Sequence, residues 1–296
     1  MSSVTWVLEP LPFGEGHAPV AAAVRAQGHR LVEWDDRWWS RGLPRGLGDG
    51  PTVFRGALEN ADRLHREAGW RPGGFCDAAR FACSAWYPAA AGVLLNGNYR
   101  VMPARTLVER AVEIAKELDA GDRLFVRPDS PLKPFSGRVV DVASLDLRAL
   151  DFGFYFDDPN LPVVAAPVRT VGREWRFVVA DGQVVAGSAY DAGSRSAKPA
   201  EPDGDATAFA TSVAASIAPP AAVYVLDVCE SGGEFRLLEL NPFGGADLYA
   251  CETGEVVRAV SEVADAAANG WAFAGGPIGQ PHRTAEEAPA RTNGVS

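Results

Sequence analysis

Three oxygen-bearing side chains are spaced along one predicted β-hairpin in the last third of the chain. Two apolar segments, Val223–Cys229 and Phe235–Leu240, flank a Gly-Gly turn, which is the pattern of two antiparallel strands. Strand side chains alternate between faces, so Glu239 and Asn241 project from the same face. If the turn is a three-residue loop, Asp227 lies opposite Glu239 on that face, whereas a shift of one residue turns Asp227 away. In the first register, the three side chains converge at one end of the hairpin.

Two neighbouring carboxylates on an apolar strand pair favour a bound cation. Carboxylates are rare among apolar strand residues unless something pairs them, and two close together repel each other unless a cation lies between them. Hard oxygen ligands suit Mg²⁺, which keeps waters and substrate phosphates as its other ligands. The alternative interpretation is a surface hairpin whose acids face water. The spacing alone leaves both interpretations open.

A loop with two cations lies near the middle of the chain. Arg127 ends an apolar strand, Lys133 follows in a loop with three prolines, and Ser136-Gly137 forms the tip of that loop. Such a loop holds a guanidinium fork and a compact ammonium charge where both can contact a polyphosphate. It is not a Walker loop, because the GxxxxGK[ST] spacing is absent. The alternative is that both cations are ordinary exposed side chains.

A second predicted hairpin lies between these two features. Its strands, Glu174–Val179 and Gln183–Tyr190, flank an Asp-Gly turn. Glu174 and Arg176 share one face, where they form either a cross-strand ion pair or a pair that faces a cleft. Just before this hairpin, the apolar strand Val163–Val168 contains a proline, which predicts an edge strand or a crossing between two lobes.

The other elements alternate strands and helices at the start of the chain and add helices later. The remaining predicted strands are Thr5–Leu8, Leu31–Trp34, Thr52–Arg55, Leu124–Arg127 and Arg138–Val142. The predicted helices are His17–Gln27, Asn60–Ala68, Asp77–Ala91, Thr106–Leu118, Asp205–Ile217 and Glu255–Ala268. Gly14-Glu15-Gly16 matches half of a dinucleotide fingerprint. A plain strand-to-helix turn is the favoured interpretation there, because the third glycine is missing.

The composition is that of an ordinary globular protein. Its 296 residues are 47% hydrophobic and 22% charged, with a formal net charge of −10. That charge argues against a broad surface for nucleic acid or anionic membranes. No apolar run approaches the ~20 residues of a membrane helix, and no secretory signal opens the chain, so a cytoplasmic location is expected. The four cysteines lack metal-ligand spacing, which argues against a structural zinc site.

Taken in order, these features resemble the ATP-grasp superfamily, most closely the branch in which arginines replace one of the usual nucleotide-binding lysines. The segments that carry the resemblance are RPDSPLKPFSG, EWRFVVADGQVVAGSAY, YVLDV and LLELNPFGGADLY, and it extends from Val4 to Ala268. It implies an α/β (α+β) fold with a small Rossmann-like N-terminal lobe at 1–104. An ATP-grasp domain at 105–275 would follow, with two α+β lobes that enclose ATP. The tail at 276–296 is predicted to be disordered.

The resemblance implies a role for each candidate residue. The catalytic cations that hold the phosphates of ATP would be Arg127, Lys133 and Arg176. The nucleotide-binding set would add Ser136, Gly137, Val168, Arg169 and Glu174. The ligands of one or two Mg²⁺ ions, or of Mn²⁺, would be Asp227, Glu239 and Asn241. The candidate substrate contacts are Arg55, Gly244 and Gly245. For Arg55, an ordinary surface ion pair is the alternative.

The reaction implied by the resemblance is an ATP-dependent ligation. A substrate carboxylate would be activated as an acylphosphate and joined to an amine, with release of ADP and phosphate. Phosphoryl transfer asks a protein mainly for positioning and charge neutralisation, which cations, carboxylate-held metal and a closing loop provide. The alternatives are a kinase of the same fold that phosphorylates a small molecule, and a non-catalytic nucleotide-binding module. The expected partners are a small-molecule, amino-acid or peptide substrate, without nucleic acid or membrane, and a homodimer would be unsurprising.

Overall fold

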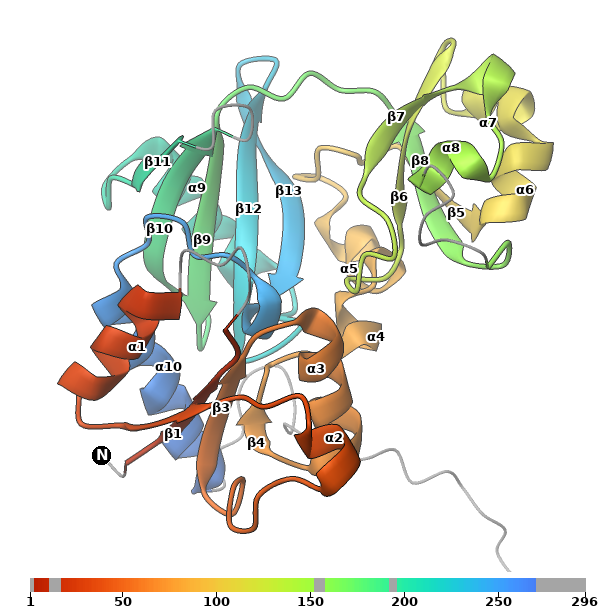
Figure 1. Cartoon of the computed structure of the whole chain (residues 1–296). Helices are drawn as coiled ribbons and strands as arrows, with labels where there is room; N and C mark the ends of the chain where they lie inside the picture. The colour runs from red at the N-terminus through yellow and green to blue at the C-terminus, as the bar shows by residue number, and fades with distance from the viewer. Residues whose placement is uncertain (1–2, 11–16, 152–157, 192–195, 270–296) are drawn as a thin grey trace, which may run out of the picture.

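The computed structural model describes residues 3–10, 17–151, 158–191 and 196–269. Three β-sheets organise this part of the chain (Figure 1). The predicted turn Gly14-Glu15-Gly16 and the predicted tail 276–296 lie outside the described residues. Within the described ranges, no helix has both the length and the apolar character needed to cross a membrane.

The first sheet is parallel and has the strand order β2-β1-β3-β4. Its strands are β1 (Thr5–Leu8), β2 (Arg30–Glu33), β3 (Pro51–Arg55) and β4 (Arg71–Gly73). The intervening helices are α1 (His17–Ala26), α2 (Trp38–Arg41), α3 (Leu58–Arg63) and the π-helical turn η1 (Leu64–Ala68). Parallel strands joined by helices are the arrangement that the alternating pattern predicts, and the α/β character of this lobe is confirmed.

The second sheet is antiparallel, has the order β11-β10-β9-β12-β13, and carries most of the candidate site. Its strands are β9 (Glu174–Ala180), β10 (Gln183–Asp191), β11 (Ser196–Pro199), β12 (Val223–Ser231) and β13 (Glu234–Pro242). Phe177 and Leu226 pack on α9 (Asp205–Ser216) on one face. Val178 and Val225 pack on α10 (Thr253–Ala268) on the other. Both predicted hairpins are confirmed.

The third sheet is also antiparallel and has the order β5-β8-β6-β7. Its strands are β5 (Arg100–Pro103), β6 (Arg123–Pro128), β7 (Arg138–Asp141) and β8 (Pro162–Pro167). The elements that pack on it or connect it are α6 (Ala104–Glu109), α7 (Ala111–Glu117), η2 (Val142–Ser144) and α8 (Arg148–Asp151). Leu107 and Ile114 join Leu124 and Val163 in its core.

Two connections join the three sheets into one molecule. The helices α4 (Ala78–Phe81) and α5 (Cys83–Ala90) lie between the second and third sheets (Figure 1). After β13, the short helix η3 (Phe243–Gly245) meets the first sheet, and α10 packs on α1, β3 and β4. The strand β5 belongs to the third sheet although it precedes the predicted boundary at residue 104.

The structure differs from the predicted elements at three places. The edge-strand alternative for Val163–Val168 is wrong, because β8 lies between β5 and β6. Pro167, the proline within the predicted segment, is the last residue of the strand. The crossing alternative is correct, since the chain passes directly from β8 to β9 of the second sheet. Thr106–Leu118 is split into α6 and α7, and Asp77–Ala91 into α4 and α5. The second break occurs where the N–H of Cys83 donates to the carbonyl oxygen of Asp129, the residue after β6, at 2.9 Å.

Candidate functional site

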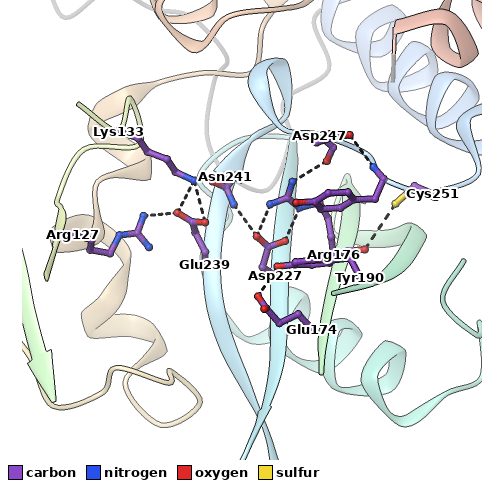
Figure 2. Close-up of polar contacts among 11 residues, drawn as sticks. Arg127, Lys133, Glu174, Arg176, Tyr190, Asp227, Glu239, Asn241, Asp247 and Cys251 are labelled. Carbon is purple, nitrogen blue, oxygen red and sulfur yellow. Dashed lines mark hydrogen bonds and ion pairs between the residues drawn. The ribbon is translucent and has the colours of Figure 1, made fainter. Parts of the chain in front are cut away.

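A buried ion pair lies on the face of the second sheet where the predicted metal ligands project. Arg176 on β9 and Asp227 on β12 are directly paired positions of neighbouring strands. The Nε and Nη2 atoms of Arg176 donate to Oδ1 and Oδ2 of Asp227 at 2.8 and 2.7 Å (Figure 2). The structure thus brings two predicted site residues together, but the partner of Arg176 is Asp227 and not Glu174.

Glu239 lies opposite Asp227, as predicted, although the turn is not the predicted one. The hairpin turns through Gly232 and Gly233 alone, both with positive φ. A two-residue turn by itself pairs Asp227 with Leu238. A β-bulge between the Asp227 and Val228 positions shifts the register by one residue and places Glu239 opposite Asp227.

The two cations of the mid-chain loop meet Glu239 from the third sheet. Arg127, on β6, donates through Nη2 to Oε1 of Glu239. Lys133 places its Nζ atom 3.1 Å from the same Oε1. Arg127 and Glu239 are almost enclosed, with side chains 11% and 15% exposed, whereas Lys133 is 39% exposed. The loop and the late hairpin, which are about a hundred residues apart in sequence, therefore share one polar centre (Figure 2).

Asn241 connects the two carboxylates. Its Nδ2 atom donates to Oδ2 of Asp227 at 3.1 Å, and its amide also contributes to lowering the pKa of Glu239. All three predicted metal ligands thus lie next to one another on the same face. Among the described residues, no group of three or more His, Cys, Asp and Glu side chains is arranged to hold a metal ion. The predicted set has two carboxylates and one amide, which are oxygen donors of the kind that Mg²⁺ takes.

Opposite charges outweigh burial at this centre. Burial alone would raise the pKa of Glu239, but the charges of Arg127 and Lys133 hold that pKa well below its usual range. Burial would likewise lower the pKa of Arg127 and of Arg176, but Glu239 and Asp227 raise the pKa of each guanidinium. The two guanidinium groups and the carboxylate of Glu239 are therefore charged at neutral pH, and each charge is matched by a neighbour.

The loop that carries Lys133 is attached firmly at its base. Asp129 is buried and accepts hydrogen bonds from the backbone N–H and the hydroxyl of Ser84, both at 2.7 Å. Lys133 itself has φ +50°. A Cβ on Gly137 would lie 2.9 Å from the ring of Phe125, so only glycine lets the returning strand pass this closely. Ser136 and Gly137 are exposed, but they lie at the base of the loop, directly before β7, and not at its predicted tip.

Two tyrosines that sequence analysis did not select complete the surroundings of Arg176. The rings of Tyr190 and Tyr249 are stacked, with centroids 4.6 Å apart, and the guanidinium of Arg176 lies 4.8 Å from the centroid of Tyr249. The hydroxyl of Tyr190 donates to Glu174 at 2.8 Å. Burial raises the pKa of Glu174, although this hydrogen bond opposes the shift. A two-residue turn by itself pairs Glu174 with Ala189, and a β-bulge between Val184 and Ala186 brings Tyr190 opposite Glu174, so no simple sequence pattern marked Tyr190 or Tyr249.

The remaining candidates lie around this centre. Val168 and Arg169 are in the crossing between the third and second sheets, where Arg169 is exposed. Arg55, at the end of β3, donates to the carbonyl oxygen of Ala246 at 2.8 Å. Gly244 and Gly245 are packed closely against the first lobe: a Cβ on Gly244 would lie 2.6 Å from the carbonyl oxygen of Gly74, and one on Gly245 would lie 2.4 Å from Leu58. The geometry gives these glycines a packing role, and substrate contact by them stays a prediction.

Comparisons with known proteins agree with the overall fold. The structure is similar to the D-cycloserine synthetase DcsG (15% identity, TM-score 0.58, covering 88% of this chain and 100% of that chain). It is similar to the ATP-grasp ligase PsnB complexed with a minimal precursor (16%, 0.53, 88% and 99%). It is also similar to the macrocyclase MdnC, bound with precursor peptide MdnA, from Microcystis aeruginosa MRC (15%, 0.54, 88% and 98%). These identities show a shared fold, and a search of curated proteins gave no match.

A family model matches the chain directly. The model describes the ATP-grasp domain, R₂K clade family 3, and it matches residues 47–260, which include every element of the site from Arg55 to Tyr249. The ATP-grasp fold, with its small α/β lobe and two antiparallel sheets, is therefore confirmed. The chain belongs to the ATP-grasp superfamily, in R₂K clade family 3.

Proposed function

We propose that the protein is an ATP-dependent ligase that activates a substrate carboxylate as an acylphosphate and joins it to an amine. The observation that carries the proposal is the meeting of Arg127, Lys133 and Arg176 with Asp227 and Glu239 in one polar centre between two sheets. The three cations would bind the negative charges of a triphosphate, and the two carboxylates would bind a divalent cation. The similar proteins DcsG and PsnB are named as a synthetase and a ligase, which supports the same class of reaction.

In this proposal the cations bind the phosphates of ATP. Arg127 and Arg176 offer guanidinium forks, and Lys133 offers a point charge on a loop. Val168 and Arg169 lie in the segment that crosses from β8 to β9, and Glu174 is the first residue of β9. These three residues would border the rest of the nucleotide. The Lys133 loop, with Ser136 and Gly137 exposed at its β7 end, would close over the phosphates and exclude water, because an acylphosphate hydrolyses easily.

The metal-binding set fits the chemistry of the fold. Asp227, Glu239 and Asn241 would hold Mg²⁺ or Mn²⁺, which would supply charge neutralisation to the phosphates of ATP. In the structure both carboxylates are held by Arg127, Lys133 and Arg176. Those cations would turn to the phosphates when nucleotide binds, so the carboxylates become available at the same moment. Residues 1–104 would supply the substrate side and residues 105–275 the nucleotide side.

The chemical steps need no covalent help from the protein. A substrate carboxylate oxygen attacks the γ-phosphorus, ADP leaves, and the nitrogen of an amine then attacks the acyl carbon and expels phosphate. The protein positions the groups and neutralises charge, and these two effects supply most of the rate enhancement in phosphoryl transfer. A kinase would stop after transfer to its acceptor and form no amide.

The test uses Glu239→Ala together with Glu234→Ala, an exposed glutamate on the same strand, as the matched control. Calorimetric titration with Mg·ATP should show that Glu239→Ala loses most of the Mg²⁺ dependence of binding, while Glu234→Ala retains it. ADP release should be stimulated by a pair of carboxylate and amine substrates, and mass spectrometry should show an amide. An unchanged Mg²⁺ dependence in Glu239→Ala removes the metal assignment, and a phosphorylated acceptor without amide identifies a kinase.

A further inference from the structure

Arg176 is held by groups of two different kinds. Its Nε and Nη2 atoms donate to the carboxylate of Asp227 at 2.8 and 2.7 Å, so this edge of the guanidinium forms the buried ion pair. Its Nη1 atom donates instead to the backbone carbonyl oxygen of Asp247 at 3.0 Å. The guanidinium carbon also lies 4.8 Å from the centroid of the Tyr249 ring, within the range of a cation–π interaction. One partner of Arg176 is therefore a carboxylate that can also bind a metal ion, whereas the other two are neutral and belong to the turn after β13.

The turn after β13 is fixed by contacts that do not involve the ion pair. The backbone N–H of Tyr249 donates to Oδ1 of Asp247 at 3.0 Å. The next N–H, that of Ala250, donates to the hydroxyl of Ser188 on β10 at 3.1 Å. Tyr249 has φ +48°, a backbone conformation that residues other than glycine and asparagine adopt rarely. These bonds tie the turn to β10, so the place of the Tyr249 ring does not depend on the ion pair.

Tyr190 on β10 supports the ring of Tyr249. The two rings are stacked, with centroids 4.6 Å apart and an angle of 20° between their planes. The ring of Tyr190 is fixed in turn, because its hydroxyl donates to Glu174 at 2.8 Å (Figure 2). The guanidinium of Arg176 lies 5.9 Å from the centroid of this second ring. Arg176 therefore lies beside an aromatic surface of two rings, each held by hydrogen bonds of its own residue.

The proposed function requires Arg176 to change its charged partner. The carboxylate of Asp227 would turn to the metal ion, and phosphate would take its place at the Nε–Nη2 edge. A guanidinium binds phosphate well because its planar fork presents parallel N–H groups, so the orientation of that plane matters. During the exchange, the carbonyl oxygen of Asp247 and the aromatic surface are the contacts that remain.

We propose that Tyr249, stacked on Tyr190, is a positioning residue for Arg176. Its ring keeps the plane of the guanidinium in place while the carboxylate of Asp227 is exchanged for phosphate. The inference rests on the proposed function and adds a residue that acts on the nucleotide only through the arginine.

The test compares a variant of Tyr249 without a ring and a variant with one. Tyr249→Asn removes the ring and suits the positive φ, and Tyr249→Phe removes only the hydroxyl. Calorimetric titration of the full chain with Mg·ATP should give a Kd about tenfold higher for Tyr249→Asn, and a Kd within about twofold of that of the parent protein for Tyr249→Phe. Phe209→Leu, which changes an aromatic side chain of α9 on the other face of the same sheet, is the matched control and should leave the Kd unchanged.

Dependence on the arginine separates positioning from a general loss of structure. Arg176→Lys keeps the charge but lacks the planar fork, so adding Tyr249→Asn to it should raise the Kd by less than about threefold. Tyr249 is 42% exposed, so both variants at this position should fold, and thermal unfolding without ligand checks this. Tyr249→Gly, which also fits the positive φ, is a second variant without a ring and should show the same loss of affinity as Tyr249→Asn.

Three results would overturn the inference. The first is a Tyr249→Asn variant that binds Mg·ATP as tightly as the parent protein. The second is a Tyr249→Phe variant that binds as weakly as Tyr249→Asn, and the third is a loss that is undiminished in Arg176→Lys. Absence of Mg·ATP binding by the parent protein would instead contradict the proposed function, so the two failures are distinguishable.

Discussion

Arg176 and Asp227 occupy directly opposed positions on β9 and β12, and their side chains are only 10% and 2% exposed. Removing one partner of such a pair leaves an uncompensated buried charge, which costs about 3–5 kcal/mol. We therefore expect Arg176→Met and Asp227→Leu each to lower the free energy of unfolding by about that amount. The double variant should lose less than the sum of the two, because it buries no unpaired charge.

Urea unfolding of the four proteins in this cycle measures the coupling. Arg258→Met, which removes the exposed ion pairs of Arg258 with Glu255 and Glu262, is the control and should change stability little. Additive single losses would show that the pair does not act as a unit.

Nucleotide and metal should bind together far better than either binds alone. The proposed metal ligands Asp227 and Glu239 are held by the cations proposed to bind phosphate. ATP alone would take the cations and leave two buried carboxylates unpaired, whereas Mg²⁺ alone would leave the cations unpaired. Thermal unfolding should show a shift with ATP and Mg²⁺ together that exceeds the sum of the separate shifts.

The size of that shift follows from mass action. A ligand present at a hundredfold excess over its Kd stabilises the folded state by about 2.7 kcal/mol, which is several degrees for a chain of this size. Chelation of the metal with EDTA should remove most of it. If ATP in the presence of EDTA raises Tm as much as ATP with Mg²⁺ does, the carboxylates do not restrain the cations.

The pairing of Asp227 with Glu239 shows what a sequence pattern can and cannot predict. Strand alternation predicts which residues share a face, and Glu239 and Asn241 share one because they are two positions apart. Once the register places Asp227 opposite Glu239, all three side chains lie on that face. The register itself depends on a β-bulge, which inserts one residue and leaves the core residues Leu237 and Leu240 on one face although they are three positions apart. The prediction reached the correct pair through a three-residue loop that the chain does not have.

Long-range contacts account for what the sequence did not indicate. Lys133 and Glu239 are brought together by the packing of two sheets, and only the family resemblance pointed to that meeting. Tyr249 has a positive φ of 48°, and its stacking on Tyr190 depends on how the turn after β13 folds back. The break between α4 and α5 depends on a bond from Cys83 to Asp129, which local helix propensity does not encode.

Gly244 should be intolerant of any side chain. A Cβ at this position would lie 2.6 Å from the carbonyl oxygen of Gly74, and backbone cannot move aside as a flexible side chain can. Gly244→Ala should therefore destabilise the protein by about 1–3 kcal/mol and weaken the contact between the first lobe and the turn after β13. Gly92→Ala, where a Cβ meets nothing within 4 Å, is the matched control. Equal stability of the two variants, measured by urea unfolding, would contradict the packing role of Gly244.

Glu174 should destabilise the fold at neutral pH, in contrast to Glu230 on the neighbouring strand. Burial raises the pKa of Glu174, so the folded state binds a proton more tightly than the unfolded state does. The resulting penalty is absent below the unfolded pKa, near 4.5, and grows as the pH rises through the folded pKa. Glu174→Gln keeps an acceptor for the hydroxyl of Tyr190 and should raise Tm at pH 7, with the gain disappearing near pH 4.5.

Glu230→Gln should show the opposite sign. The hydrogen bond from Arg173 lowers the pKa of Glu230, so its stabilising effect is present above pH 4.5 and is lost as the pH falls through the folded pKa. This variant should therefore lower Tm at pH 7 and match the parent protein in acid. Tm of the parent protein and of both variants, measured from pH 8 down to about pH 2, tests both predictions. If Glu174→Gln lowers Tm at pH 7, the carboxylate of Glu174 is stabilised by its surroundings, and the effect of its burial has been outweighed by Arg176.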